Sequence, residues 1–332
     1  MRRFALIVAV AGAVLAPATP AFAHAGDIPG ATAYRTSVTA VSAPGVSVRA
    51  VEAGARLELS NETGHSVEVL GYAGEPYLDV RPDGTWQNVN SPAAYINETA
   101  NGDTPVPATA DVTAPPSWRK LSDSTTVRWH DQRTQWLNPS VPPQAVADPS
   151  RSHRLRDWSV PLRVQTTAYE VRGTLDWEPP PVAWLWWAGA ALAGLAAAAL
   201  AHRWPRSVRA VALVAGLAPL AYGVMSLLDG ATPSPVLFLA GLMALAAVYR
   251  HPPFYLALTG AVVALFAGFN ETRVFFAAVV PTTGPGWAVR LAVVLALGLG
   301  AGLALTGLLR MRAAVPARTP EPTPAAKQTL VS

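Results

Sequence analysis

The densest group of residues that could do chemistry lies at residues 128–136, which read RWHDQRTQW. The run places His130 beside Asp131, and imidazole nitrogens and carboxylate oxygens are common metal ligands. In an extended strand, Asp131 and Arg133 would share one face, where their opposite charges would pair. Two interpretations follow: a metal site, or a structural strand whose tryptophans pack and whose polar groups are hydrogen-bonded. Buried polar groups are usually satisfied within the protein, which favours the structural interpretation.

The N-terminus supplies a second candidate ligand. Residues 1–23 have the features of a secretory signal peptide: two arginines, a short apolar stretch, and Ala-Phe-Ala before the expected cleavage point. Cleavage there makes His24 the first residue, so its amine and imidazole can bind Cu(II) together. We therefore predict a copper site formed by His24, His130 and Asp131. Two other histidines of the exported part are alternates: His65 and His153. The competing interpretation is a free terminus and ordinary surface histidines.

Nothing else in the sequence indicates catalysis. The chain has no phosphate-binding loop, dinucleotide fingerprint or zinc-protease motif. It contains no cysteine, which excludes thiolate ligands and disulfides. We therefore predict no catalytic or cofactor-binding residue and do not expect an enzyme. A ligand groove is the alternative to plain core packing for five further residues: Tyr72, Glu75, Tyr77, Trp86 and Tyr95.

The composition indicates a membrane protein. Of the 332 residues, 51% are hydrophobic and 14% are charged, whereas soluble proteins average about 25% charged residues. Apolar stretches long enough to cross a bilayer begin after residue 181. We expect a transmembrane bundle at 182–312 with about five helices: 183–201, 208–228, 234–249, 253–269 and 287–309. The apolar segment 274–280 is too short to span and is expected to lie at the interface or on the bundle.

The basic residues predict the orientation of these helices in the plasma membrane. Loops rich in arginine and lysine stay in the cytoplasm, and such residues follow the first, third and fifth predicted helices. This pattern places the exported domain outside and the tail, 313–332, in the cytoplasm. The tail is rich in proline and is predicted to be disordered. The sequence pI of about 9.6 reflects these cytoplasmic arginines, so the expected partners are the lipid bilayer and another membrane or envelope protein, not nucleic acid.

The exported part, residues 24–181, shows the period-two alternation of β-strands. The alternating stretches are 46–51, 55–60 and 67–70. Turn sequences separate the strands, and a spacing of about ten residues is typical of immunoglobulin-like β-sandwiches. The predicted fold is an all-β extracytoplasmic domain followed by an α-helical transmembrane bundle.

Three segments resemble a family of actinobacterial membrane proteins that are mostly known only as hypothetical or uncharacterised. The segments are 67–97 with LGYAGEPYL, 129–136 with WHDQRTQW, and 157–181 ending in GTLDWEPPP. The family pattern includes LGY-x-GEPYL and a Trp-His-Asp-His-Arg-x-His-Trp run. Gln132 and Gln135 stand where that pattern has histidines, so a metal site of the relatives would lack two imidazoles here. The resemblance implies family membership and no established activity.

The layout has a looser similarity to periplasmic copper-resistance proteins fused to their membrane partner. A mature His24-Ala25 start, a small β domain and membrane helices carry this similarity. We therefore expect the exported domain to bind a ligand or partner at the outer face of the membrane, with Cu(II) as the sharper hypothesis. The alternative is a structural or interaction module that the helices anchor, with no metal or catalytic role.

Overall fold

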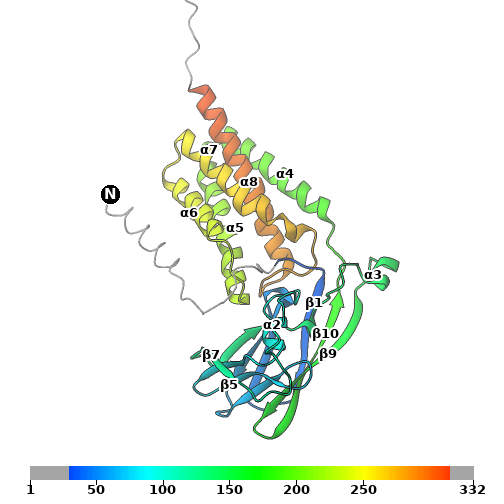
Figure 1. The fold of residues 1–332 in the computed structure, drawn as a ribbon. Helices are drawn as coiled ribbons and strands as arrows, with labels where there is room; N and C mark the ends of the chain where they lie inside the picture. The colour runs from blue at the N-terminus through cyan, green and yellow to red at the C-terminus, as the bar shows by residue number, and fades with distance from the viewer. Residues whose placement is uncertain (1–29, 315–332) are drawn as a thin grey trace, which may run out of the picture.

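The computed structural model describes residues 30–314, and two regions follow one another along this part of the chain (Figure 1). The β region, residues 30–181, is built from antiparallel strands, and the helical region, residues 182–314, from apolar helices. The predicted signal peptide, His24 and residues 315–332 of the predicted tail lie outside the described residues. The predicted order, a β domain ahead of a helical bundle, is confirmed.

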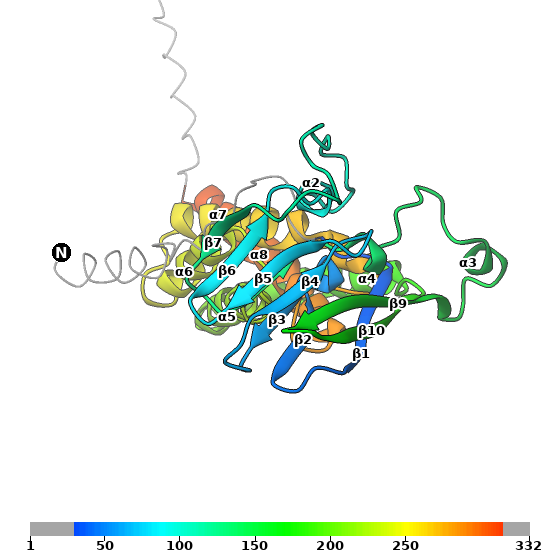
Figure 2. The ribbon, with the colours of Figure 1, turned by 60° about the horizontal axis from the view of Figure 1, so that its bottom comes forward.

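The larger of two sheets contains seven antiparallel strands (Figure 2). Their spatial order is β1 (Tyr34–Val41), β10 (Thr167–Trp177), β9 (His153–Val164), β4 (Val67–Leu70), β5 (Pro76–Arg81), β6 (Gly84–Asn88) and β7 (Trp118–Ser122). The long strands β9 and β10 form a hairpin. The first strand, β1, pairs antiparallel with β10, and Tyr34 lies opposite Trp177.

The smaller sheet contains three antiparallel strands: β2 (Val46–Val51), β3 (Arg56–Asn61) and β8 (Thr126–Trp129). It shares one hydrophobic core with the larger sheet, because Leu57, Leu59 and Trp129 pack with Val160 and Leu162. The strands β3 and β4 alternate between buried and half-buried side chains, as the sequence predicts. Among the described strands, β7 and β8 each end a sheet and leave one side unpaired. The closed immunoglobulin-like sandwich stays a prediction.

Short helical segments connect these strands: η1 (Glu52–Gly54), α2 (Ala93–Ile96), η2 (Gln132–Thr134) and α3 (Pro143–Ala147). The loop that carries α3 projects away from both sheets in both ribbon views (Figure 1; Figure 2). The segments η1 and η2 take part in polar contacts, since Ala53 of η1 donates to Asp229 and Arg133 of η2 donates to Asp131.

The helical region is an antiparallel bundle. Its elements are α4 (Ala183–Arg203), α5 (Ser207–Asp229), α6 (Pro235–Tyr249), α7 (Pro253–Val262), the π-helix η3 (Val263–Gly268), the 3-10 helix η4 (Phe269–Phe275) and α8 (Gly286–Ala313). Small residues let the axes approach closely. A Cβ on Gly298 of α8, for example, would lie 2.4 Å from the carbonyl oxygen of Ala190 in α4.

Within residues 30–314, four helical stretches are long and apolar enough to cross a membrane: Ala183–Arg203, Ser207–Asp229, Pro253–Phe275 and Gly286–Ala313. They match four of the five predicted spans, although the third continues beyond the predicted end at residue 269 because η3 and η4 extend α7. The remaining predicted span is the helix α6, which has 15 residues. At 1.5 Å per residue it is about 22 Å long, short of the roughly 30 Å of a bilayer core.

The segment predicted to lie at the interface, 274–280, contacts the β region. Val279 and Thr32 exchange two backbone N–H···O hydrogen bonds of 2.9 Å. Arg290 of α8 stabilises this segment, since its guanidinium donates to the carbonyl oxygens of Val274, Ala277 and Ala278. The chain between η4 and α8 therefore joins the helical region to the β region.

Candidate functional site

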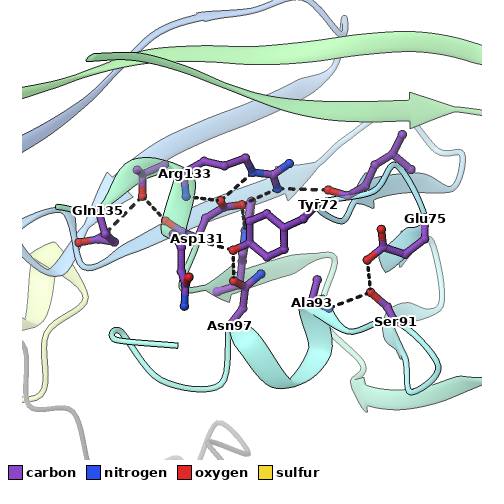
Figure 3. A network of polar contacts seen from close by, with 12 residues as sticks. Tyr72, Glu75, Ser91, Ala93, Asn97, Asp131, Arg133 and Gln135 are labelled. Carbon is purple, nitrogen blue, oxygen red and sulfur yellow. Dashed lines mark hydrogen bonds and ion pairs between the residues drawn. The ribbon is translucent and has the colours of Figure 1, made fainter. Parts of the chain in front are cut away.

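The carboxylate of Asp131 is the centre of a buried polar cluster (Figure 3). Its side chain has no exposed surface. It accepts hydrogen bonds from Nε and Nη2 of Arg133, at 2.8 and 2.7 Å, and from the Arg133 backbone N–H at 3.1 Å. The indole Nε1 of Trp129 donates a further bond at 3.1 Å. The pairing predicted between Asp131 and Arg133 is confirmed.

Arg133 extends this cluster to the larger sheet. Its Nη2 also donates to the carbonyl oxygen of Leu70 at 3.2 Å, and its guanidinium lies 4.9 Å from the ring centre of Tyr72. Burial by itself would lower the pKa of Arg133, but the hydrogen bonds and the charge of Asp131 raise it above its ordinary value. The guanidinium of Arg133 therefore keeps its positive charge.

Tyr72 connects the cluster to the helix α2. Its hydroxyl donates to Oδ1 of Asn97 and accepts a hydrogen bond of 3.0 Å from the backbone N–H of Gln132. Burial, with a smaller contribution from the charge of Asp131, raises the pKa of Tyr72. The phenol is therefore neutral, and its hydroxyl donates one hydrogen bond and accepts another. Beside it, the carboxylate of Glu75 accepts from the hydroxyl of Ser91 at 2.7 Å (Figure 3).

The strand predicted for RWHDQRTQW is wrong after Trp129. The strand β8 ends there, and residues 132–134 form the 3-10 turn η2. The cause is local: the Asp131 side chain accepts from the Arg133 N–H, and the Thr134 hydroxyl donates to the Asp131 carbonyl oxygen at 2.7 Å. Such side-chain bonds compete with a strand ladder and favour a turn. The predicted division of the run into two strand faces therefore fails.

His130 is buried, with 3% of its surface exposed, and both ring nitrogens are engaged. Nδ1 lies 2.8 Å from the carbonyl oxygen of Ala55, and Nε2 lies 3.1 Å from Nε of Arg56. A carbonyl only accepts and a guanidinium only donates, so Nδ1 carries the proton and the Nε2 lone pair is used. A metal ion at Nε2 would have to displace Arg56, which also binds Glu52 at 2.9 Å.

The other predicted ligands are placed apart from a common centre. Nε2 of His153 lies 2.6 Å from the carbonyl oxygen of Asp148, and Nδ1 of His65 lies 3.5 Å from Gln165. Within residues 30–314, no three histidine, aspartate or glutamate side chains are grouped to hold a metal ion. His24 lies outside the described residues, so the copper site that it would form with His130 and Asp131 stays a prediction.

A second polar centre joins the two regions and is not predicted from the sequence. In the turn η1, Glu52, Ala53 and Gly54 have φ angles of 57°, 58° and 87°. Such left-handed angles cost roughly 1–3 kcal/mol for residues other than glycine. The turn aims the N–H of Ala53 at the carboxylate of Asp229, at 3.3 Å, and Asp229 is the last residue of α5. Successive N–H groups in this conformation form an anion-binding concavity.

Arg128 completes this junction between β8 and the end of α5. Its Nη1 donates to the carbonyl oxygen of Gly230 at 2.9 Å, and its Nε donates to Glu58 at 2.5 Å. Gly230 has a φ of 93°, and a Cβ there would lie 2.6 Å from the Arg128 guanidinium. The glycine therefore ends the helix and leaves room for the arginine.

The acidic residues of the junction differ in their pKa. Burial raises the pKa of Glu52, although the ion pair with Arg56 opposes this shift. Burial also acts to raise the pKa of Glu58, but hydrogen bonds from Arg49 and Arg128 lower it below its ordinary value. Local sequence patterns do not show that these charges meet a helix of the other region.

Comparisons with known proteins assign no family. No protein-family model, no curated protein and no solved structure matches the chain. The resemblance to uncharacterised actinobacterial membrane proteins therefore stays a prediction.

Proposed function

We propose that the chain is a multi-pass protein of the plasma membrane that presents its β region as a fixed module on the outer ends of the helices. There the β region binds a ligand or a partner protein. The four apolar stretches support the membrane part of this proposal. The basic residues after α4, α6 and α8 support the orientation, because positively charged ends stay in the cytoplasm.

The junction between the regions is the observation that carries the proposal. A β domain that is only tethered needs no specific contact with its anchor. Here Ala53 binds Asp229, Arg128 binds Gly230, and Thr32 pairs with Val279. Each contact joins the β region to a chain segment at the same end of the bundle (Figure 1). Such contacts fix the orientation of the β region on the membrane.

Copper binding by the described histidines is not part of the proposal. The imidazole of His130 is engaged at both nitrogens, and Asp131 uses its carboxylate to hold Arg133 and Trp129. In this proposal the run RWHDQRTQW has a structural role, because its hydrogen bonds connect the two sheets with the 3-10 turn η2.

A disulfide across the junction tests the proposal. The chain lacks cysteine, so a Thr32→Cys, Val279→Cys variant contains a single thiol pair. Antiparallel partners that exchange two hydrogen bonds have Cα atoms about 5.5 Å apart, a distance that suits a disulfide. We expect mild oxidation of isolated membranes to form this disulfide. Both thiols then no longer react with maleimide-polyethylene glycol, and the band shift that this reagent causes on a gel disappears.

The matched control is Thr39→Cys with Val279→Cys. Thr39 lies on β1, seven residues beyond Thr32, which is about 23 Å along an extended chain. We expect this pair to stay reduced. Equal oxidation rates for the two pairs would indicate a mobile tether and would contradict the proposal.

A further inference from the structure

A small cavity of about 150 Å³ opens where the two sheets separate. It lies between β6 and β7 of the larger sheet and the edge strand β8 of the smaller sheet, beside the helix α2. The lining residues come from all these elements: Arg56, Tyr77, Leu78, Gln87, Ala94, Asn97, Glu98, Arg119, Leu121, Val127, Arg128, Trp129 and His130. The cavity is smaller than the roughly 300–1,000 Å³ of typical ligand pockets, so it suits a compact molecule.

The cavity has an apolar floor with aromatic faces. Tyr77, Leu78 and Trp129 are all at most 3% exposed and belong to the shared core. Burial raises the pKa of Tyr77, so its phenol is neutral. A flat apolar group can therefore pack on this floor without leaving a buried charge unpaired.

One donor in the cavity has no partner. Asn97 is 5% exposed, and its Oδ1 accepts from Tyr72, but its Nδ2 makes no hydrogen bond. The Tyr77 hydroxyl lies near the Asn97 side chain, but its position does not meet the geometry of a hydrogen bond from Nδ2. A buried amide without an acceptor costs roughly 1–3 kcal/mol. An acceptor oxygen of a ligand would satisfy it.

An exposed arginine of the lining can meet an anion. Arg56 and Arg128 also line the cavity, but their charges are compensated by ion pairs with Glu52 and Glu58. The cation that faces a ligand is Arg119, and the carboxylate of Glu98 also belongs to the lining. Arg119 lies at the exposed rim, where its Nη2 donates to Gln87 at 2.7 Å.

We propose that this cavity binds a small organic carboxylate with a flat apolar body. One carboxylate oxygen accepts from Nδ2 of Asn97, the negative charge faces Arg119, and the body packs on Tyr77 and Trp129. This site rests on the proposed function and specifies its ligand class. Arg128 lines the cavity and also holds Gly230 of the helical region, so the occupied site borders the junction.

Benzoate is the probe, and the purified full-length protein is titrated with it by isothermal calorimetry. We expect saturable binding, weakened at least tenfold by Asn97→Asp, which keeps the acceptor for Tyr72 and replaces only the unpaired donor. Arg119→Gln, at the exposed rim, is expected to weaken binding without affecting the fold. Arg172→Gln, on the exposed outer face of β10, is the matched control and is expected to leave the affinity unchanged.

Three outcomes would overturn the site: no saturable binding of benzoate, equal affinity in all four proteins, or binding of inorganic phosphate in place of benzoate. The last result would indicate a site for inorganic anions. The disulfide between positions 32 and 279 separates this failure from that of the proposed function. If benzoate does not bind but the cross-link forms, the proposed binding site is wrong and the proposal of a fixed β region still stands.

Discussion

Asp131 shows how a residue in a motif typical of reactive sites can make structural contacts with its whole carboxylate. Its two oxygens accept from the guanidinium and N–H of Arg133 and from the indole of Trp129, away from solvent. Its neighbour His130 is held between Ala55 and Arg56. Both groups that are chemically able to bind a metal or move a proton thus have protein partners, and the run fixes the turn that follows β8.

Replacing Asp131 by asparagine tests this structural role. The variant leaves the guanidinium of Arg133 without its counter-ion, and breaking a buried ion pair costs about 3–5 kcal/mol. For a domain of this size we expect the melting temperature, followed by tryptophan fluorescence, to fall by about 10 °C.

The control for this variant is Asp157→Asn. Asp157 pairs with Arg154 at 2.8 Å, but their side chains are 79% and 54% exposed. Exposed ion pairs contribute only about 0–1 kcal/mol, so the melting temperature should change little. Similar effects of the two substitutions would show that the Asp131 carboxylate does not hold the turn.

The helices depend on close contact between small residues. Gly298 and Gly302 of α8 face α4, where a Cβ at Gly302 would lie 2.6 Å from Cβ of Ala197. Gly300 faces the π-helix η3, where a Cβ would lie 2.6 Å from the backbone nitrogen of Ala264. A bilayer gives little hydrophobic force between helices, so van der Waals packing of this kind holds them together.

Gly298→Ala should therefore destabilise the bundle. The new methyl group would lie 2.4 Å from the Ala190 oxygen and 2.8 Å from Cβ of Ala193, which forces the helices apart. We expect a loss of about 1–3 kcal/mol, measured by thermal unfolding of the full-length protein in detergent. Gly189→Ala on α4 is the control, since its nearest neighbour is Val294 at 3.7 Å. It should be neutral or gain up to about 1 kcal/mol from helix propensity.

The elements were predictable from the sequence where one local pattern determines them. Period-two alternation found β2, β3 and β4, and long uncharged stretches found the helices. The turn at residues 132–134 was missed because the Asp131 side chain, and not the hydrophobic pattern, ends the strand. The pair Asp131–Arg133 was predicted on a wrong geometry, since it forms within a turn and not along a strand.

The junction could not be predicted because its partners are distant in sequence. Ala53 and Asp229 are separated by 176 residues, and no local pattern indicates that a left-handed turn meets a helix end. The same holds for the cavity beside Asn97, which exists because strands from two sheets separate at one end. Residue types alone do not show that the Nδ2 group of Asn97 lacks a hydrogen-bond acceptor.

At the scale of the whole molecule, the helix α6 decides the topology. It packs antiparallel to α5, since Gly223 lies against Phe238 and Gly216 lies against Gly241. It begins beside Gly230, at the end of the bundle that holds the β region, and leads away from it (Figure 1). We infer that α6 crosses the membrane despite its length, which places Arg250 in the cytoplasm with the other basic loops.

Single cysteines in this cysteine-free chain test that inference with a membrane-impermeant maleimide on intact cells. Ser140→Cys, in an exposed loop of the β region, should be labelled at once. Arg206→Cys, between α4 and α5, should be labelled only after the membrane is permeabilised. Arg250→Cys is decisive, because a helix α6 that fails to cross would leave this position outside with Ser140. Its labelling in intact cells would reduce the bundle to four spans and place the C-terminal arginines outside, against the charge rule that predicts the orientation.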